Sequence, residues 1–185
     1  MKKNTQTYFI LIIVLIAFFN VCFSNNLEKT NYLKPDNFLP PCGTVYCPIT
    51  YANPEAITNV TFAGINRSTG ANGTGGSHQF LCNTGNVEQE GTYSISVNGD
   101  TDGNYLNSIT VFIDWDQDGN FNNTNERYEI GTFANNNGFG APITNDIFVP
   151  ASASLGTTTM RVIKRYDNTV LYALSGCNPG STYGQ

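Results

Sequence analysis

Apolar and polar residues alternate along most of the chain after residue 44, a period of two that is typical of β-strands with one buried face. In the segment 93–97, for example, single serines separate the apolar residues Tyr93, Ile95 and Val97. No segment keeps a helical period over several turns. The pattern predicts strands around residues 60–62, 93–97, 109–115, 128–130, 147–149, 160–166 and 170–174.

Clusters of Gly, Asn, Ser and Pro, such as residues 70–76 and 135–138, separate these segments and favour turns. Short strands joined by frequent turns predict an all-β fold, an antiparallel β-sandwich of jelly-roll or immunoglobulin-like type in a single domain. Residues 160–166 carry bulky side chains at both parities, so we expect both faces of that strand to pack. Trp115 shares the parity of Ile109, which predicts core packing rather than ligand stacking.

The N-terminus has the pattern of a secretory signal peptide. Lys2 and Lys3 precede an apolar run over residues 9–19, and the segment ends in small residues at Cys22 and Ser24. We predict a signal peptide over residues 1–24, an extended leader over 25–41 and the sandwich domain over 42–185, in a secreted or cell-surface protein without a transmembrane anchor. Lipid attachment at Cys22 is the alternative, which the residues before Cys22 disfavour.

The charge balance is acidic. Without Lys2 and Lys3 the chain has seven basic residues against fourteen acidic ones. Nucleic-acid binding depends on basic patches, so this composition argues against it. An acidic extracellular protein is instead suited to contact with cations.

Four cysteines remain after removal of the signal peptide, and an even number in an exported chain predicts two disulfides with three possible pairings. We expect Cys47 to pair with Cys177, closing a long loop between the first and last parts of the domain, and Cys42 to pair with Cys82. A zinc site that uses Cys42 and Cys47 is the alternative, but no suitable second pair of ligands is evident.

An acidic run follows the predicted strand 109–113. Its carboxylates at Asp114, Asp116 and Asp118 alternate, and Glu126 follows later. Calcium binds six to eight oxygen ligands, so we predict a Ca²⁺ site formed by these four acids and the carbonyl of Asn120. The run starts like an EF-hand loop, but its twelfth position is not an acid and strands flank it. A polar hairpin without metal is the alternative, because Asp-Gly is itself a turn signal.

The sequence offers little support for catalysis. His78 is the single histidine and lies in a Gly/Ser-rich stretch, and neither a Gly-x-Ser-x-Gly nor a His-Glu-x-x-His motif is present. A Ser-His-Asp triad would need His78 as its base, but a solvated loop histidine is the favoured interpretation. Tyr105, Phe133, Phe139 and Tyr172 form a weak candidate for an aromatic platform that binds sugars.

Several motifs follow one another in a characteristic order along the chain. The motifs are Tyr46-Cys47, residues 57–65, residues 91–97, the Ile-Asp-Trp-Asp-Gln-Asp-Gly run at 113–119, the Gly-Thr-Thr-Thr-Met-Arg-Val run at 156–162, Cys177 and Tyr183-Gly184-Gln185. This order resembles the GEVED domain of secreted and surface proteins, mostly of Bacteroidetes-type bacteria, over residues 42–185. The resemblance implies an extracellular β-sandwich module and implies no reaction.

The resemblance also implies that the domain is incomplete. Members of the family continue the terminal Gly-Gln into an acidic motif and a closing strand, whereas the sequence ends at Gln185. We therefore expect the strand at 170–174 to be the last one, with no later residue able to pair with the sheet.

Two functions from different classes fit the sequence. The first is a non-catalytic binding or adhesion module that calcium and disulfides stabilise, with an extracellular protein or polysaccharide as partner. The alternative is an accessory domain in a fragment of a larger secreted hydrolase, a peptidase in particular. The sequence that follows residue 185 in the gene would discriminate between them.

Overall fold

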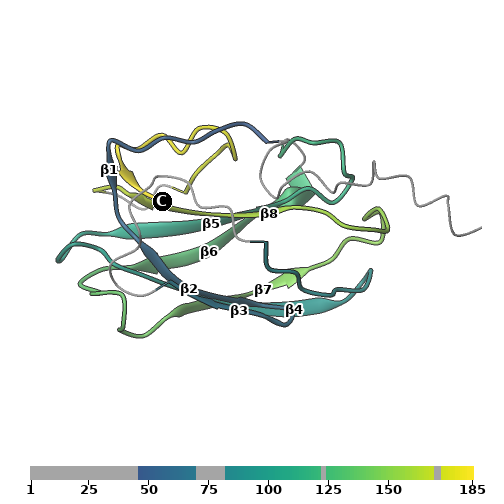
Figure 1. The fold of residues 1–185 in the computed structure, drawn as a ribbon, viewed down its shortest axis with the longest axis horizontal. Helices are drawn as coiled ribbons and strands as arrows, with labels where there is room; N and C mark the ends of the chain where they lie inside the picture. Colours follow the sequence, from purple (N-terminus) through teal and green to yellow (C-terminus); the bar gives the residue numbers. More distant parts are fainter. Residues whose placement is uncertain (1–45, 70–81, 122–123, 169–171) are drawn as a thin grey trace, which may run out of the picture. The chain divides into compact units, whose positions relative to one another are not determined.

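A computed structural model describes residues 46–69, 82–121, 124–168 and 172–185. The predicted signal peptide, the leader, Cys42 and His78 lie outside the described residues. The described part contains two β-sheets and a single short 3-10 turn, η1 (Thr124–Glu126), and no α-helix (Figure 1). The predicted all-β sandwich is therefore confirmed.

The larger sheet has five strands and the smaller has four. The larger follows the order β1 (Asn53–Pro54), β9 (Tyr183–Gly184), β8 (Met160–Tyr166), β5 (Asn107–Ile113) and β6 (Arg127–Phe133). The smaller follows the order β3 (Ile65–Ser68), β2 (Ile57–Phe62), β4 (Thr92–Gly99) and β7 (Ile143–Phe148). All pairs are antiparallel except β1 with β9.

The main core lies between the two sheets. It follows from the alternation in the sequence, because one parity of each strand is apolar and faces the other sheet. Ile109, Val111 and Trp115 face it from the β5 side, and Ile95 and Val97 face it from β4. All five are at most 5% exposed. The prediction that Trp115 packs in the core is confirmed.

A second, smaller core covers the outer face of the five-stranded sheet. Phe112 of β5 and Ile163 of β8 point to this side and pack with Ile49, Tyr51 and Phe121. Because the second parity of β5 is covered in this way, every residue of β5 is buried. Ile49, Tyr51 and Phe121 lie outside the strands. Burying one large apolar side chain contributes about 1.5–3 kcal/mol, so these residues stabilise the five-stranded sheet substantially.

The predicted last strand of the fold is wrong. Residues 172–174 do not form the predicted strand, and Leu174 is 83% exposed. Instead, β9 lies between β1 and β8, and Lys164 and Gln185 exchange two backbone hydrogen bonds of 2.7 and 3.0 Å. The expectation that no residue after Leu174 pairs with the sheet is therefore wrong. A two-residue strand has too few positions to show an alternating pattern.

Candidate metal site

The acidic loop, which we define as residues 114–126, connects the two strands of the β5–β6 hairpin. Side chains alternate along β5 and just beyond it, so Trp115 faces the main core and Asp114 faces the outer side of the five-stranded sheet. Asp114 is only 1% exposed. The segment just before β8 fixes the backbone of Asp114. The Asp114 N–H donates to the Thr159 carbonyl at 3.2 Å, and the Asp114 carbonyl accepts a hydrogen bond from the Thr158 hydroxyl.

The side chain of Asp114 organises the turn that follows it. Its Oδ1 accepts a hydrogen bond from the N–H of Asp118 at 3.1 Å, and its Oδ2 accepts one from the N–H of Gly119 at 3.0 Å. Gln117 and Gly119 both have positive φ, at 61° and 84°. The Asp-Gln-Asp-Gly sequence allows this tight reversal, since glycine adopts positive φ without a steric penalty.

The reversal brings three carboxylates together. One oxygen from each of Asp114, Asp116 and Asp118 lies within 4.8 Å of the other two, and the last two residues are exposed to solvent. Two oxygens bound to one calcium ion are at most about 5 Å apart, since each Ca–O distance is about 2.3–2.6 Å. The arrangement is thus compatible with a shared calcium ion, and solvent has access to it.

The two remaining predicted ligands lie differently. Glu126 is 1% exposed, and its Oε1 accepts a hydrogen bond from the N–H of Trp115 at 3.0 Å. It is not among the three acids whose carboxylates converge in the described residues. The N–H of Asn120 donates to Oδ1 of Asp118 at 2.7 Å, which places Asn120 next to the cluster. Ligation by Glu126 and Asn120 stays a prediction.

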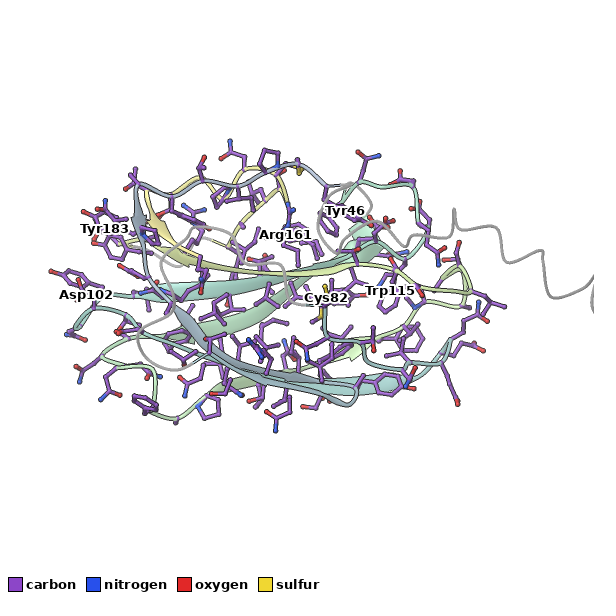
Figure 2. The ribbon with its side chains drawn as sticks, in the orientation of Figure 1. Tyr46, Cys82, Asp102, Trp115, Arg161 and Tyr183 are labelled. Atoms are coloured by element: carbon purple, nitrogen blue, oxygen red, sulfur yellow. A yellow bond between two sulfur atoms is a disulfide. The ribbon has the colours of Figure 1, made fainter. Side chains whose placement is uncertain are left out.

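An aromatic residue outside the acidic loop supports it. The phenol of Tyr46 donates a hydrogen bond to Oδ2 of Asp114, and its ring stacks on Phe121 with centroids 4.6 Å apart. Burial, reinforced by this hydrogen bond, raises the pKa of Tyr46 to about 12. Tyr46 and Trp115 lie toward one end of the sandwich, and Asp102 and Tyr183 lie at the other (Figure 2).

A disulfide fixes the segment that carries Tyr46. Cys47 is bonded to Cys177, with their Cα atoms 5.5 Å apart. Arg161 of β8 binds both sides of the bridge, since it donates to the Cys47 carbonyl at 2.9 Å and to the Gly176 carbonyl. Its guanidinium also lies 5.1 Å from the centre of the Phe121 ring. Burial lowers the pKa of Arg161, and the two carbonyls accept hydrogen bonds from its guanidinium.

The second predicted disulfide involves Cys42, which lies outside the described residues. Cys82 is itself disulfide-bonded. The four aromatic residues suggested as a platform do not share one environment. Phe133 packs against the main core, whereas Tyr105 and Phe139 are 51% and 72% exposed.

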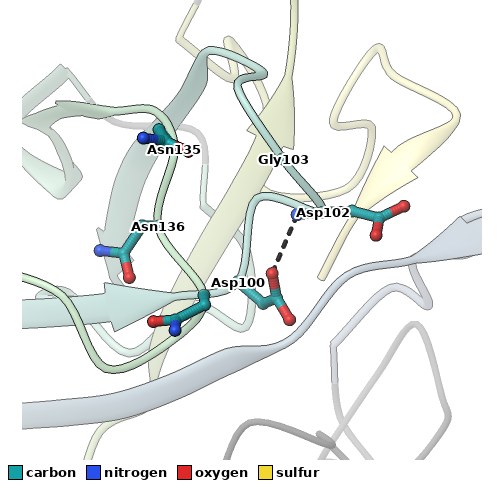
Figure 3. A pocket seen from close by; sticks show the side chains of 6 residues that line it. Asp100, Asp102, Gly103, Asn135 and Asn136 are labelled. Atoms are coloured by element: carbon teal, nitrogen blue, oxygen red, sulfur yellow. Dashed lines mark hydrogen bonds between the residues drawn. The ribbon is translucent and has the colours of Figure 1, made fainter.

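The opposite end of the sandwich contains a hollow that the sequence did not reveal. It has a volume of about 430 Å³ and is lined by residues of the β4–β5 and β6–β7 loops. Figure 3 shows Asp100, Asp102, Asn135 and Asn136 around it. The Asp-Thr-Asp-Gly sequence at 100–103 marks a polar turn in the β4–β5 loop, but it carries no sign of the β6–β7 loop that completes the hollow.

Comparison with known families supports the resemblance. Residues 108–185 match the GEVED domain family. The match runs from β5 to β9 and therefore includes the acidic loop and Cys177. GEVED domains are non-catalytic modules of the extracellular type and act as accessory or binding domains. The resemblance over residues 42–107 stays a prediction.

No curated protein and no solved structure matches the chain. Within the residues that the structure describes, no helix has the length and apolar character needed to cross a membrane.

Proposed function

We propose that the chain is a secreted or cell-surface, non-catalytic binding or adhesion module with a GEVED domain, and that a calcium ion holds its acidic loop. The observation that carries this proposal is the convergence of the Asp114, Asp116 and Asp118 carboxylates within 4.8 Å. Three like charges so close together repel one another, and a hard divalent cation converts the repulsion into binding.

The proposed ion is bound by these three aspartates, with the Asn120 carbonyl and Glu126 as further oxygen donors. Asp114 is fixed from the outset by its backbone and side-chain hydrogen bonds. A site with one prepositioned ligand loses less conformational freedom when the ion binds. Calcium that binds only the folded state would stabilise the domain by about 2.7 kcal/mol at a hundredfold excess over Kd.

The Cys47–Cys177 bridge supports an extracellular location, because disulfides persist in oxidising compartments. Export through the signal peptide at residues 1–24 is part of the proposal. The partner is an extracellular protein or polysaccharide, and the module contributes contact rather than chemistry.

The test is a thermal melt of the folded domain in calcium and in EDTA. We expect calcium to raise Tm in the wild-type protein, and Asp116→Asn to remove most of the increase. This substitution keeps the shape of a side chain that accepts the Asp118 N–H at 3.2 Å, but removes its charge.

Asp146→Asn is the matched control, since Asp146 is an exposed acid of β7 outside the acidic loop. It should leave the calcium response unchanged. The same Tm in calcium and EDTA for folded wild-type protein would contradict the calcium site, as would an equal loss of response in both variants.

A further inference from the structure

The hollow at the end of the sandwich opposite the acidic loop is built on a fixed polar floor. Asn136 is 7% exposed, and its side-chain oxygen accepts hydrogen bonds from the N–H groups of Gly138 and Gly140 at 2.9 and 3.0 Å. Its amide nitrogen donates to Asn98 at 2.8 Å. A floor with satisfied hydrogen bonds keeps its shape before a ligand arrives, which lowers the entropic cost of binding.

Backbone hydrogen bonds join the two loops that form the hollow. Thr101 N–H donates to the Asn136 carbonyl at 2.8 Å, and Asn135 N–H donates to the Gly103 carbonyl at 3.1 Å. The Thr101 hydroxyl, on a residue that is fully buried, donates to the Gly103 carbonyl at 2.6 Å. The two loops therefore act as one rigid rim.

The rim displays acceptors and donors together. Asp100 and Asp102 contribute carboxylates, and Asn135 and Asn137 contribute amides, each of which can both donate and accept. Vicinal hydroxyl groups of a sugar match this set, because each hydroxyl donates to a carboxylate and accepts from an amide. The volume of 430 Å³ lies within the range of about 300–1,000 Å³ for small-ligand pockets.

An aromatic surface adjoins the hollow. A Cβ atom added at Gly103 would lie 3.5 Å from the ring of Tyr105, so this ring lies directly against the rim. Tyr105 meets Tyr166 edge-on at 5.4 Å, and Tyr166 meets Tyr183 edge-on at 5.7 Å. Tyr105 and Tyr183 remain 51% and 41% exposed. Such rings present apolar area to the C–H face of a sugar and keep their hydroxyl groups in water.

The charges around the hollow disfavour an anionic ligand, because the two carboxylates would repel it. A buried ion pair also lies within the electrostatic reach of the two carboxylates. The Lys164 ammonium, which is fully buried, lies 2.7 Å from Glu55 and is attracted by Asp100 and Asp102. Glu55 balances the charge of Lys164, so this pair leaves the negative potential of the two carboxylates in place. The hollow is less suited to a cation than the acidic loop because two carboxylates line it, whereas three converge in the acidic loop.

From this geometry we infer that the hollow between the β4–β5 and β6–β7 loops, together with Tyr105 and Tyr183, is a binding site for a neutral polysaccharide. One sugar residue occupies the hollow and its neighbours in the chain lie along the tyrosines. The inference rests on the proposed function as a binding module, but it does not depend on calcium. The β5 strand separates the two sites by roughly 20 Å, at about 3.4 Å per residue.

The experiment is affinity electrophoresis of the wild-type protein through gels that contain mannan, xylan, laminarin, galactan or soluble starch. We expect at least one of these polysaccharides to retard the protein. Asp102→Asn and Tyr105→Ala should each weaken that retardation at least tenfold. Retardation by none of the five would overturn the inference.

Phe148→Ala is the control, because Phe148 is a 52% exposed aromatic residue at the other end of β7. It should bind like the wild type. If Tyr105→Ala fails to fold, Asp102→Asn and Asn137→Ala decide the question. Equal weakening in Phe148→Ala would point to non-specific aromatic contact and would contradict the inference.

Thermal melts of the same variants in calcium and in EDTA distinguish this inference from the proposed function. Asp116→Asn should lose the calcium response and keep polysaccharide binding, and Asp102→Asn should do the reverse. If Asp102→Asn instead loses a calcium-dependent increase in Tm and binds polysaccharide normally, the hollow is a cation site and the inference is wrong.

Discussion

Tyr46 and Asp114 are 68 positions apart in the sequence, yet the phenol of the first donates a hydrogen bond to the carboxylate of the second. This contact connects the segment before β1 to the acidic loop between β5 and β6. It makes the geometry of the first proposed calcium ligand depend on a residue outside the acidic loop.

Tyr46→Phe should destabilise the domain by about 1.5–3 kcal/mol, the usual range for a hydrogen bond to a charged group. The ring still stacks on Phe121, so the loss reports the hydroxyl alone. Urea denaturation in EDTA measures it. Tyr105→Phe is the control, since its ring is 51% exposed, and should change stability by less than about 0.5 kcal/mol. Equal effects in the two variants would show that the Tyr46 hydroxyl contributes nothing specific.

Burial of Tyr46, together with the same hydrogen bond, predicts a response to alkaline pH. The pKa of Tyr46 is raised from 10.0 to about 12, so the folded state holds this proton more tightly than the unfolded state does. The associated stability is fully present below pH 10 and is lost as the pH rises toward 12. Burial lowers the pKa of Lys164, which has the opposite effect on stability. The urea midpoint of the wild type should therefore fall more steeply over this window than that of Tyr46→Phe, and parallel curves would contradict the assignment.

The Cys47–Cys177 bridge spans 130 positions, and a loop of this length restricts the unfolded chain strongly. Replacing both cysteines by serine should cost about 2–4 kcal/mol in urea denaturation. Because Cys47 follows Tyr46, the variant should also bind calcium more weakly. A variant with an unchanged unfolding midpoint would mean that the Arg161 contacts alone hold this segment.

Glu55 is the direct charged partner of the buried Lys164 ammonium, at 2.7 Å, and Asn107 adds a neutral acceptor at 2.9 Å. Glu55→Gln leaves a buried charge without its counter-charge and should destabilise the domain by about 3 kcal/mol. Glu129→Gln breaks the more exposed Arg127–Glu129 pair, also at 2.7 Å, and should cost less than about 1 kcal/mol. Similar losses of unfolding free energy in the two variants, measured by urea denaturation, would show that burial does not set the contribution of these two ion pairs to stability.

Strands with several residues of one parity in a core were readable from the sequence. β4, β5 and β8 are such strands, because burial of one face requires alternation and burial of both faces requires bulky residues at both parities. β3 was missed because most of its residues are exposed, which removes the apolar signal. β1 and β9 were missed because two residues cannot display a period.

The candidate calcium site likewise has a part that the sequence predicts and a part that it does not. Alternating aspartates followed by glycine are local in sequence, so their spacing alone predicts a shared loop. Tyr46 and Arg161 support that loop from distant segments, and no local pattern marks such contacts. The hollow between the β4–β5 and β6–β7 loops depends on two loops that meet only after both sheets have formed.

The placement of β9 between β1 and β8 bears on how the chain folds during synthesis. β1 emerges from the ribosome long before its partner β9, so the five-stranded sheet stays incomplete until residues 183 and 184 are available. Contacts between such distant segments carry a high loop-closure entropy and fold slowly. The smaller sheet needs nothing beyond residue 148 and can pair earlier. We therefore expect the four-stranded sheet to form first during translation, and the five-stranded sheet to be completed only after β9 has emerged.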